Sequence, residues 1–160
     1  MTKDATLKDN KENRSSSVKK SILIKSTKKK VWEKISDIAD MDWVAGVKKT
    51  VHISKIKRGI GAGRKIILED GNVIKEYVVG WNPEKYFSYI ATSGLPLRAY
   101  HATISIEPNE RNFIKLVWKS YFNSEPMTEV EFTEFVSYLQ SFYESSLKKL
   151  KIILYIKIDN

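Results

Sequence analysis

The most regular apolar pattern of this chain lies near its C-terminus, in residues 128–152. Apolar residues recur there at gaps of three and four, the spacing that keeps side chains on one face of a helix. They are Phe132, Phe135, Val136, Leu139, Phe142, Tyr143, Leu147 and Leu150. Thr128 followed by Glu131 has the form of a capping box, and lysines cluster near residue 150, where they complement the helix dipole. The pattern predicts one amphipathic helix of roughly 36 Å, long enough to cross a small sheet.

Shorter patterns upstream predict strands, turns and two short helices. Residues 18–26 alternate as a strand does, Ser26 or Thr27 then caps a helix of about ten residues, and a second helical turn follows at 41–45. Further strands are predicted at 48–57, 63–69, 72–81, 85–93, 98–107 and 112–123. Asp70-Gly71 is a hairpin signal, and every connection between these strands is too short for a parallel crossover. The sheet is therefore predicted to be antiparallel.

The two ends of the chain differ from this patterned middle. Residues 1–17 are polar and charged and bury too little apolar surface to offset the entropy of ordering, so we predict a disordered arm. Residues 18–152 are predicted to form a single domain, and residues 153–160 a C-terminal tail to which the sequence assigns no role.

Composition narrows the class of protein. The chain has 160 residues, of which 42% are hydrophobic, and no cysteine, which excludes disulfides, thiolate catalysis and zinc sites with sulfur ligands. Residues 1–17 lack the apolar core of a signal peptide, and the longest apolar run, 152–156, is too short to span a bilayer. We expect a cytoplasmic protein without a membrane span.

The net charge of +9 raises the alternative of a polyanion-binding protein. Lysine supplies nearly all of the excess, whereas sites that read nucleic-acid sequence rely on arginine forks and exposed aromatic platforms. The arginines are few and scattered, at Arg14, Arg58, Arg64, Arg98 and Arg111. We interpret the lysines as a solvated surface with no specific nucleic-acid partner, and keep weak attraction to anionic surfaces as an alternative.

Alternation along the strands predicts which side chains face the long helix. On strand 98–107 the inward set is Arg98, Tyr100, Ala102, Ile104 and Ile106, which places His101 outside. Trp118 is predicted to face inward on the last strand. Strands 72–81 and 85–93 fit either orientation, so the faces of Glu76 and Tyr89 stay open at this point.

A set of short motifs points to a family. The motifs are Val31-Trp32, Trp43, Gly61-x-Gly63-Arg64, the Asp70-Gly71 hairpin with Glu76 after it, and Pro96-Leu97-Arg98-x-Tyr100. With these motifs in this order, the chain resembles the START-like SRPBCC superfamily, in particular its polyketide cyclase/dehydrase-like group. The resemblance implies an α+β helix-grip (START/Bet v-like) fold. In that fold a curved antiparallel sheet of about seven strands surrounds a long C-terminal helix, and two short helices follow the first strand.

The chain is more distantly similar to the plant abscisic-acid receptors, in which two loops close over a ligand. Here the segment that matches the longer loop is a tight hairpin at residues 69–71, so the resemblance implies neither a hormone-style lid nor the phosphatase partner that depends on it. Lys48 falls near a carboxylate-binding lysine of those receptors. It also lies in a lysine-rich run, and we interpret it as a surface residue.

The family resemblance implies a cavity between sheet and helix, with Glu76 facing inward. The predicted ligand-binding residues are Trp43, Arg64, Glu76, Tyr89, Leu97, Arg98, Tyr100, Trp118, Phe135, Leu139, Phe142 and Tyr143. Charged groups in such a place form an internal ion pair, or include an arginine at the rim whose head reaches solvent, or orient a mostly apolar ligand. These interpretations stay open from sequence.

The leading functional hypothesis is binding of a small hydrophobic or amphipathic molecule, lipid-like or polyketide-like. The alternative is an enzyme of the cyclase or dehydratase type, with Glu76 and Tyr100 as candidate catalytic residues. A buried Glu76 would have a raised pKa if unpaired, whereas pairing with Arg64 would reverse that shift, and the sequence leaves the direction open. His52 and His101 lack partners at a telling spacing, and we predict neither a metal nor another cofactor. The sequence makes no prediction of oligomeric state.

Overall fold

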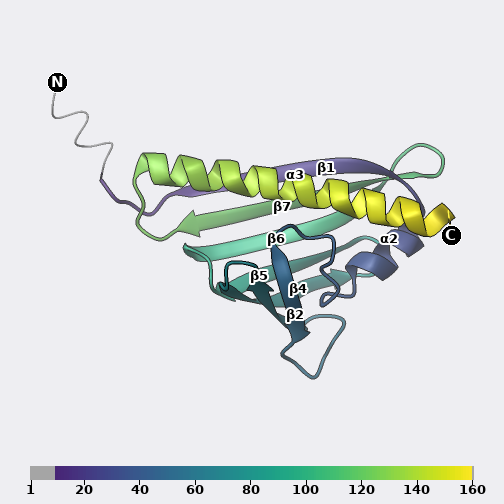
Figure 1. The fold of residues 1–160 in the computed structure, drawn as a ribbon, viewed down its shortest axis with the longest axis horizontal. Helices are drawn as coiled ribbons and strands as arrows, with labels where there is room; N and C mark the ends of the chain where they lie inside the picture. Colours follow the sequence, from purple (N-terminus) through teal and green to yellow (C-terminus); the bar gives the residue numbers. More distant parts are fainter. Residues whose placement is uncertain (1–9, 160) are drawn as a thin grey trace.

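One long helix crosses a seven-stranded antiparallel sheet in the computed structural model, which describes residues 10–159 (Figure 1). The strands are β1 Ser15–Lys25, β2 Val47–His52, β3 Gly63–Leu68, β4 Val73–Asn82, β5 Tyr86–Ser93, β6 Leu97–Pro108 and β7 Phe113–Ser124. Their order in the sheet is β1-β7-β6-β5-β4-β3-β2, so β2 to β7 form a meander and β1 pairs with β7. The predicted helix-grip fold is confirmed.

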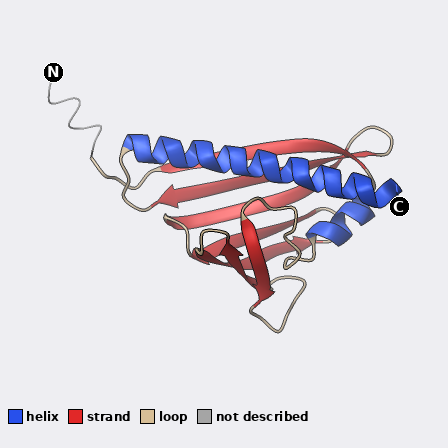
Figure 2. Cartoon of the chain, in the orientation of Figure 1, coloured by secondary structure: helices blue, strands red, loops and turns tan. Residues whose placement is uncertain are grey.

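Helix α3, Glu129–Asp159, runs along the sheet beside β1 and β7 (Figures 1 and 2). The capping box is present: the backbone N–H of Thr128 donates to Glu131 Oε1 at 3.0 Å, and the N–H of Glu131 donates to Thr128 Oγ1 at 3.1 Å. The buried stripe continues past the predicted end at residue 152, because Leu154 also lies in the core. The tail expected from residue 153 is therefore helical as far as Asp159. Among residues 10–159 no helix is long and apolar enough to cross a membrane.

A single short helix, α2 Lys28–Ile35, follows β1, where two were predicted. Residues 37–44 instead form turns, with hydrogen bonds from Asp40 N–H to Asp37 O and from Val44 N–H to Met41 O, both 3.0 Å. The Lys34 ammonium lies 2.8 Å from Asp40 and 2.7 Å from Asp42. Lys34 thus joins both carboxylates across the turns, and the second helix predicted at 41–45 does not form.

The N-terminal part of the chain is ordered earlier than predicted. β1 begins at Ser15, and before it Arg14 exchanges hydrogen bonds with Ser124, through Arg14 N–H to Ser124 Oγ at 2.9 Å and Ser124 N–H to Arg14 O at 2.8 Å. Glu12 forms an isolated bridge with Met127. The prediction of a disordered arm is wrong for residues 10–17, because backbone pairing with the end of β7 supplies the partners that composition does not reveal. Residues 1–9 lie outside the described residues.

The inner face of the sheet follows the predicted alternation. Tyr100, Ala102, Ile104 and Ile106 of β6 are buried, as is Trp118 of β7. The two strands that sequence left open are resolved by burial: β4 turns Glu76 inward and β5 turns Tyr89 inward.

Candidate functional site

A cavity of about 230 Å³ lies between the sheet and the first half of α3. Its walls come from the turns after α2, from strands β2 to β7 and two of the connections between them, and from α3. The lining residues are Met41, Val44, Ala45, Gly46, Val47, Arg64, Ile66, Leu68, Glu69, Asp70, Ile74, Glu76, Tyr89, Leu95, Tyr100, Trp118, Phe135, Tyr138, Leu139 and Phe142. Most of these side chains are apolar or aromatic, so the cavity has the character of a small-molecule site.

The lining divides into an exposed entrance and a buried inner end. Gly46, Glu69, Asp70 and Tyr138 are exposed, and they lie where the turns after α2, the β3–β4 hairpin and α3 meet. The polar groups of the inner end come from neighbouring strands and are buried: Arg64 on β3, Glu76 on β4, Tyr89 on β5 and Tyr100 on β6. Because antiparallel pairing puts Arg64 directly opposite Glu76, the sheet itself brings the two charges together.

Arg64 and Glu76 form a buried ion pair. Arg64 Nε donates to Glu76 Oε1 at 2.9 Å, and Arg64 Nη2 lies 2.8 Å from the same oxygen. Arg64 Nη1 donates to the backbone oxygen of Ile38 at 3.0 Å, and the guanidinium lies over the Tyr89 ring at 4.9 Å. Both ion-pair contacts use Oε1, so Glu76 Oε2 takes part in neither. The guanidinium is held by the fold, while the carboxylate keeps one oxygen outside the pair.

Burial raises the pKa of Glu76 above its ordinary value, even though Arg64 works in the opposite direction. The sequence left the direction of this shift open, and the structure resolves it: loss of water around the carboxylate outweighs one guanidinium. Burial likewise raises the pKa of Tyr89 and Tyr100 well above the ordinary value, so both phenols keep their protons.

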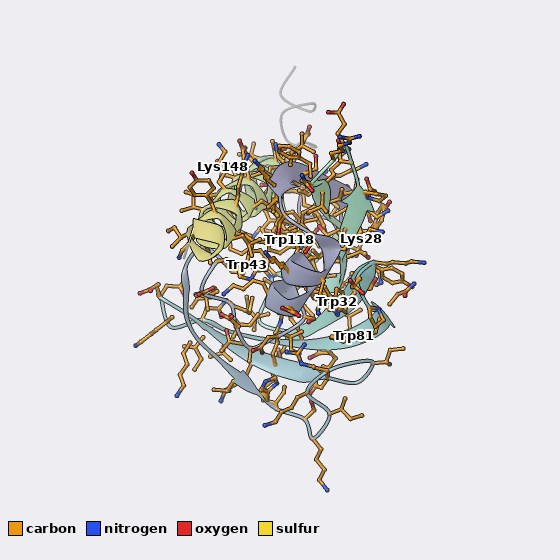
Figure 3. The ribbon with its side chains drawn as sticks, turned by 90° about the vertical axis from the view of Figure 1, so that its right-hand side faces the viewer. Lys28, Trp32, Trp43, Trp81, Trp118 and Lys148 are labelled. Atoms are coloured by element: carbon orange, nitrogen blue, oxygen red, sulfur yellow. The ribbon has the colours of Figure 1, made fainter. Side chains whose placement is uncertain are left out.

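An aromatic hydrogen-bonded cluster supports the inner end. Trp118 Nε1 donates to Tyr89 OH at 3.0 Å, and the hydroxyls of Tyr100 and Tyr143 are hydrogen-bonded to each other. Tyr143 stacks on Trp118 with ring centroids 4.0 Å apart, and Trp43 packs edge-on against Trp118 with ring centroids 5.5 Å apart. Figure 3 labels Trp43 and Trp118 close together in the interior. These contacts fix the tyrosine hydroxyls in position.

Eight of the twelve predicted ligand-binding residues line the cavity: Arg64, Glu76, Tyr89, Tyr100, Trp118, Phe135, Leu139 and Phe142. Trp43 and Tyr143 are buried behind this lining and contact it through Trp118. Leu97 is half-buried and packs against the core away from the cavity.

The prediction that Arg98 faces inward with Tyr100 is wrong. Its side chain is exposed, and its Nε donates to Asn123 Oδ1 at 2.7 Å. The register between β6 and β7 shifts between Leu97 and Ala99, so the alternation that holds from Tyr100 onward does not extend back to Arg98. Lys48 is also exposed and does not line the cavity, as expected for a surface lysine.

Sequence reasoning missed the residues that irregular segments contribute. Met41, Val44, Ala45 and Gly46 line the cavity from the turns after α2, and Leu95 does so from the β5–β6 loop. Neither the helical period of 3.6 residues nor the strand period of two applies to such segments, so the sequence pattern could not assign these residues to the cavity. The one signal available was the apolar character of Met41, Trp43 and Val44, which predicts burial and not which side faces a void.

Hydrogen bonds tie the entrance segments to one another. Glu69 N–H donates to Gly46 O at 2.9 Å, and Asn72 Nδ2 donates to Gly94 O at 2.9 Å. The β3–β4 hairpin is thus attached both to the turns after α2 and to the β5–β6 loop. Among residues 10–159, no group of three His, Cys, Asp or Glu side chains lies together as metal ligands would.

The sequence matches over residues 15–153 a family model described as polyketide cyclase / dehydrase and lipid transport. The chain belongs to this family. A search of curated proteins finds no match.

Solved structures with the polyketide cyclase/dehydrase fold are similar along most of the chain. The protein XoxI from Bacillus cereus is 19% identical, with a TM-score of 0.76 over 91% of this chain and 99% of its own. Norcoclaurine synthase from Thalictrum flavum, solved with dopamine and hydroxybenzaldehyde, is 14% identical with a TM-score of 0.68 over 89% of this chain and 88% of its own. The di-domain ARO/CYC protein StfQ of the steffimycin biosynthetic pathway is 12% identical with a TM-score of 0.76, over 91% of this chain and 52% of its own. At these identities the likeness shows the fold alone.

Proposed function

We propose that this protein binds a small apolar or amphipathic molecule in the cavity beneath α3. The observation that carries the proposal is a mostly apolar cavity whose inner end presents a buried carboxylate and two tyrosines. A few polar groups in an apolar lining are the usual means of orienting a small ligand. Membership of a family described by cyclase, dehydrase and lipid transport supports a ligand in this place.

The size of the cavity limits the ligand. Its volume of about 230 Å³ exceeds the roughly 150 Å³ of an apolar cavity that accepts benzene and is below the roughly 300–1,000 Å³ of pockets for drug-sized ligands. A single substituted ring or a short chain fits this space. A lipid with two acyl chains or a polyketide of several fused rings exceeds it, so the proposal is narrower than the hypothesis from sequence.

The inner polar groups favour a ligand with a hydroxyl at its buried end. Glu76 Oε2 is a hydrogen-bond acceptor outside the ion pair with Arg64, and the hydroxyls of Tyr89 and Tyr100, which keep their protons, belong to residues that line the same end of the cavity. A hydroxyl both donates and accepts, and it satisfies such a set better than a purely apolar group does.

A thermal-shift and calorimetric comparison of p-cresol with toluene tests the proposal. The two differ in one hydroxyl, so p-cresol should bind more tightly, by roughly tenfold for one hydrogen bond to a charged group. Ile74→Phe narrows the cavity from β4 and should abolish binding of both. Val79→Phe, on the same strand but exposed, is the matched control and should leave binding unchanged. If neither a wide panel of single-ring and short-chain compounds nor p-cresol stabilises the protein, the proposal fails.

A second candidate is catalysis of a cyclisation or dehydration in the same cavity. It is favoured by the raised pKa of Glu76, since a carboxylate in an apolar site is a stronger base than one in water. In a dehydration, Glu76 would take the proton from the carbon next to a carbonyl while a tyrosine hydroxyl donates a hydrogen bond to the carbonyl oxygen. Glu76 would then return that proton to the hydroxyl on the neighbouring carbon, whose C–O bond breaks so that water leaves and a C=C bond remains. A single-ring β-hydroxy ketone is the substrate to assay, and Glu76→Gln should remove turnover while Tyr100→Phe lowers it. Equal turnover in wild type and both variants would contradict catalysis and leave binding intact.

A further inference from the structure

The entrance of the cavity is acidic, although the chain as a whole has a net charge of +9. Glu69 and Asp70, at the end of β3 and in the following hairpin, both line the cavity and are exposed. The hairpin that carries them is fixed by Glu69 N–H to Gly46 O and by Asn72 N–H to Asp70 Oδ1, at 2.9 Å and 2.8 Å. These two acidic residues are therefore held at a defined place beside the cavity.

No positive charge offsets them at the entrance. Among the described residues that line the cavity, Arg64 is the one cation, and it lies at the inner end with its guanidinium bound to Glu76 and to Ile38 O. Lys48 and Lys49, the lysines nearest in sequence to the entrance turns, are exposed and do not line the cavity. A carboxylate ligand would meet acidic groups at both ends of the cavity.

An exposed aromatic ring also favours a positively charged group at the entrance. Tyr138 of α3 lines the entrance with 64% of its surface exposed and stacks on Phe142, with ring centroids 6.3 Å apart. The face of an exposed aromatic ring attracts cations, and nearby carboxylates act in the same direction.

We propose that the ligand is an amphipathic amine, whose apolar ring or chain fills the cavity while its protonated amino group lies at the entrance beside Glu69, Asp70 and Tyr138. This inference rests on the proposed function and names the chemical class of its ligand. The apolar walls contribute most of the affinity, and the entrance selects the charge.

Three probes of nearly equal shape separate charge from apolar binding: 2-phenylethylamine as the cation, 2-phenylethanol as the neutral compound and phenylacetate as the anion. Calorimetry on the full chain at low salt should give the amine roughly three- to tenfold tighter binding than the alcohol, and the anion the weakest, because exposed charges interact modestly through water. The advantage of the amine should shrink as salt is added, since the entrance is open to solvent.

Neutralising the entrance supplies the matched variants. Glu69→Gln with Asp70→Asn should bring the amine close to the alcohol, while the alcohol keeps its affinity; the asparagine retains the oxygen that accepts from Asn72 N–H. Glu84→Gln with Glu110→Gln removes the same charge from two exposed turns elsewhere and should leave the preference for the amine unchanged.

The outcomes distinguish this inference from the proposed function. If the alcohol binds as tightly as the amine, or the anion binds best, the amine assignment is overturned and the cavity remains a binding site. If the amine is preferred but the Glu69 and Asp70 variant keeps that preference, the entrance is not its source and the inference is also overturned. If nothing binds, including the wider neutral panel, the proposed function falls as well.

Discussion

At the scale of single residues, Glu76 is a carboxylate held where its charge is disfavoured. It is buried, its pKa is raised in spite of Arg64, and one of its oxygens lies outside the ion pair. Glu76 also lines the cavity, so a ligand that donates a hydrogen bond to this second oxygen would explain why a carboxylate is buried here.

Replacing Glu76 by glutamine should make stability less dependent on pH. A raised pKa means that folded protein holds the Glu76 proton more tightly than unfolded protein does. The contribution of this proton to stability is complete below the ordinary value of 4.5 and is lost as the pH rises through the raised pKa. The unfolding free energy of wild type minus Glu76→Gln, from urea titrations between about pH 4 and pH 8, should therefore decrease with pH. A difference that increases with pH would mean that Arg64 outweighs burial.

Removing Arg64 should lower the stability of the folded protein. Arg64→Met leaves the Glu76 carboxylate buried without its partner, which should cost about 3–5 kcal/mol at neutral pH in urea unfolding. Adding Glu76→Gln to Arg64→Met should restore most of that loss, because no buried charge remains. Arg111→Met, at an exposed arginine, is the control and should change stability by less than about 0.5 kcal/mol. A double variant as unstable as Arg64→Met alone would show that the charge of Glu76 is not the cause.

Single-residue orientation was predictable where strands are regular. The inward set from Tyr100 to Ile106 followed from alternation, whereas Arg98 did not, because a register shift beside it is invisible in a one-letter pattern. Alternation could not assign Glu76 or Tyr89, since both faces of their strands carry apolar residues. The family resemblance predicted that Glu76 faces inward, which its burial confirms, whereas the face of Tyr89 was resolved by burial alone.

At the scale of elements, the entrance is built from short connections attached to one another. The β3–β4 hairpin contacts the turns after α2 through Glu69 and Gly46, and the β5–β6 loop through Asn72 and Gly94. The turns are in turn fixed by Lys34, whose ammonium joins Asp40 and Asp42. These contacts join the segments of the entrance into one rim.

Gly94 is the most demanding position of this rim. Its φ is +98°, and a Cβ atom there would lie 2.7 Å from Ile74 Cα and closer still to Val73 O. Gly94→Ala should therefore cost more than about 3 kcal/mol and weaken ligand binding through the displaced β4. Gly71→Ala is the matched control: its φ is +90°, but nothing lies within 4 Å of the added atom, so backbone strain alone should cost about 1 kcal/mol. Equal losses in urea unfolding would contradict the close packing of Gly94 on β4.

Elements with strong local signals were predictable, and those ordered by distant partners were not. The capping box and the apolar face of α3 are visible in the sequence, so the start of this helix was predicted correctly. Its continuation to Asp159 depends on burying Leu154, and the order of residues 10–17 depends on pairing with the end of β7. The turns at 37–44 depend on Lys34, which lies in another element.

At the scale of the whole molecule, the cavity exists because α3 does not fill the concave side of the sheet. The C-terminal half of α3 packs tightly, with Leu147, Leu150 and Leu154 buried, whereas Phe135 and Tyr138 in its first half border the void. The sequence predicted the sheet, the helix and the likelihood of a pocket through a family resemblance. The volume of the cavity and its acidic entrance could not be predicted without the structure, because both depend on turns that carry no periodic signal.

A crystal structure with 4-bromophenol soaked into the cavity tests the central claim most directly, because bromine marks the position of the ring by its anomalous signal. We predict density between Tyr89, Tyr100 and Phe142, with the hydroxyl toward Glu76 and the bromine toward the entrance beside Tyr138. Side chains that fill the space beneath α3, or bromine density confined to the outer surface of the protein, would contradict the account.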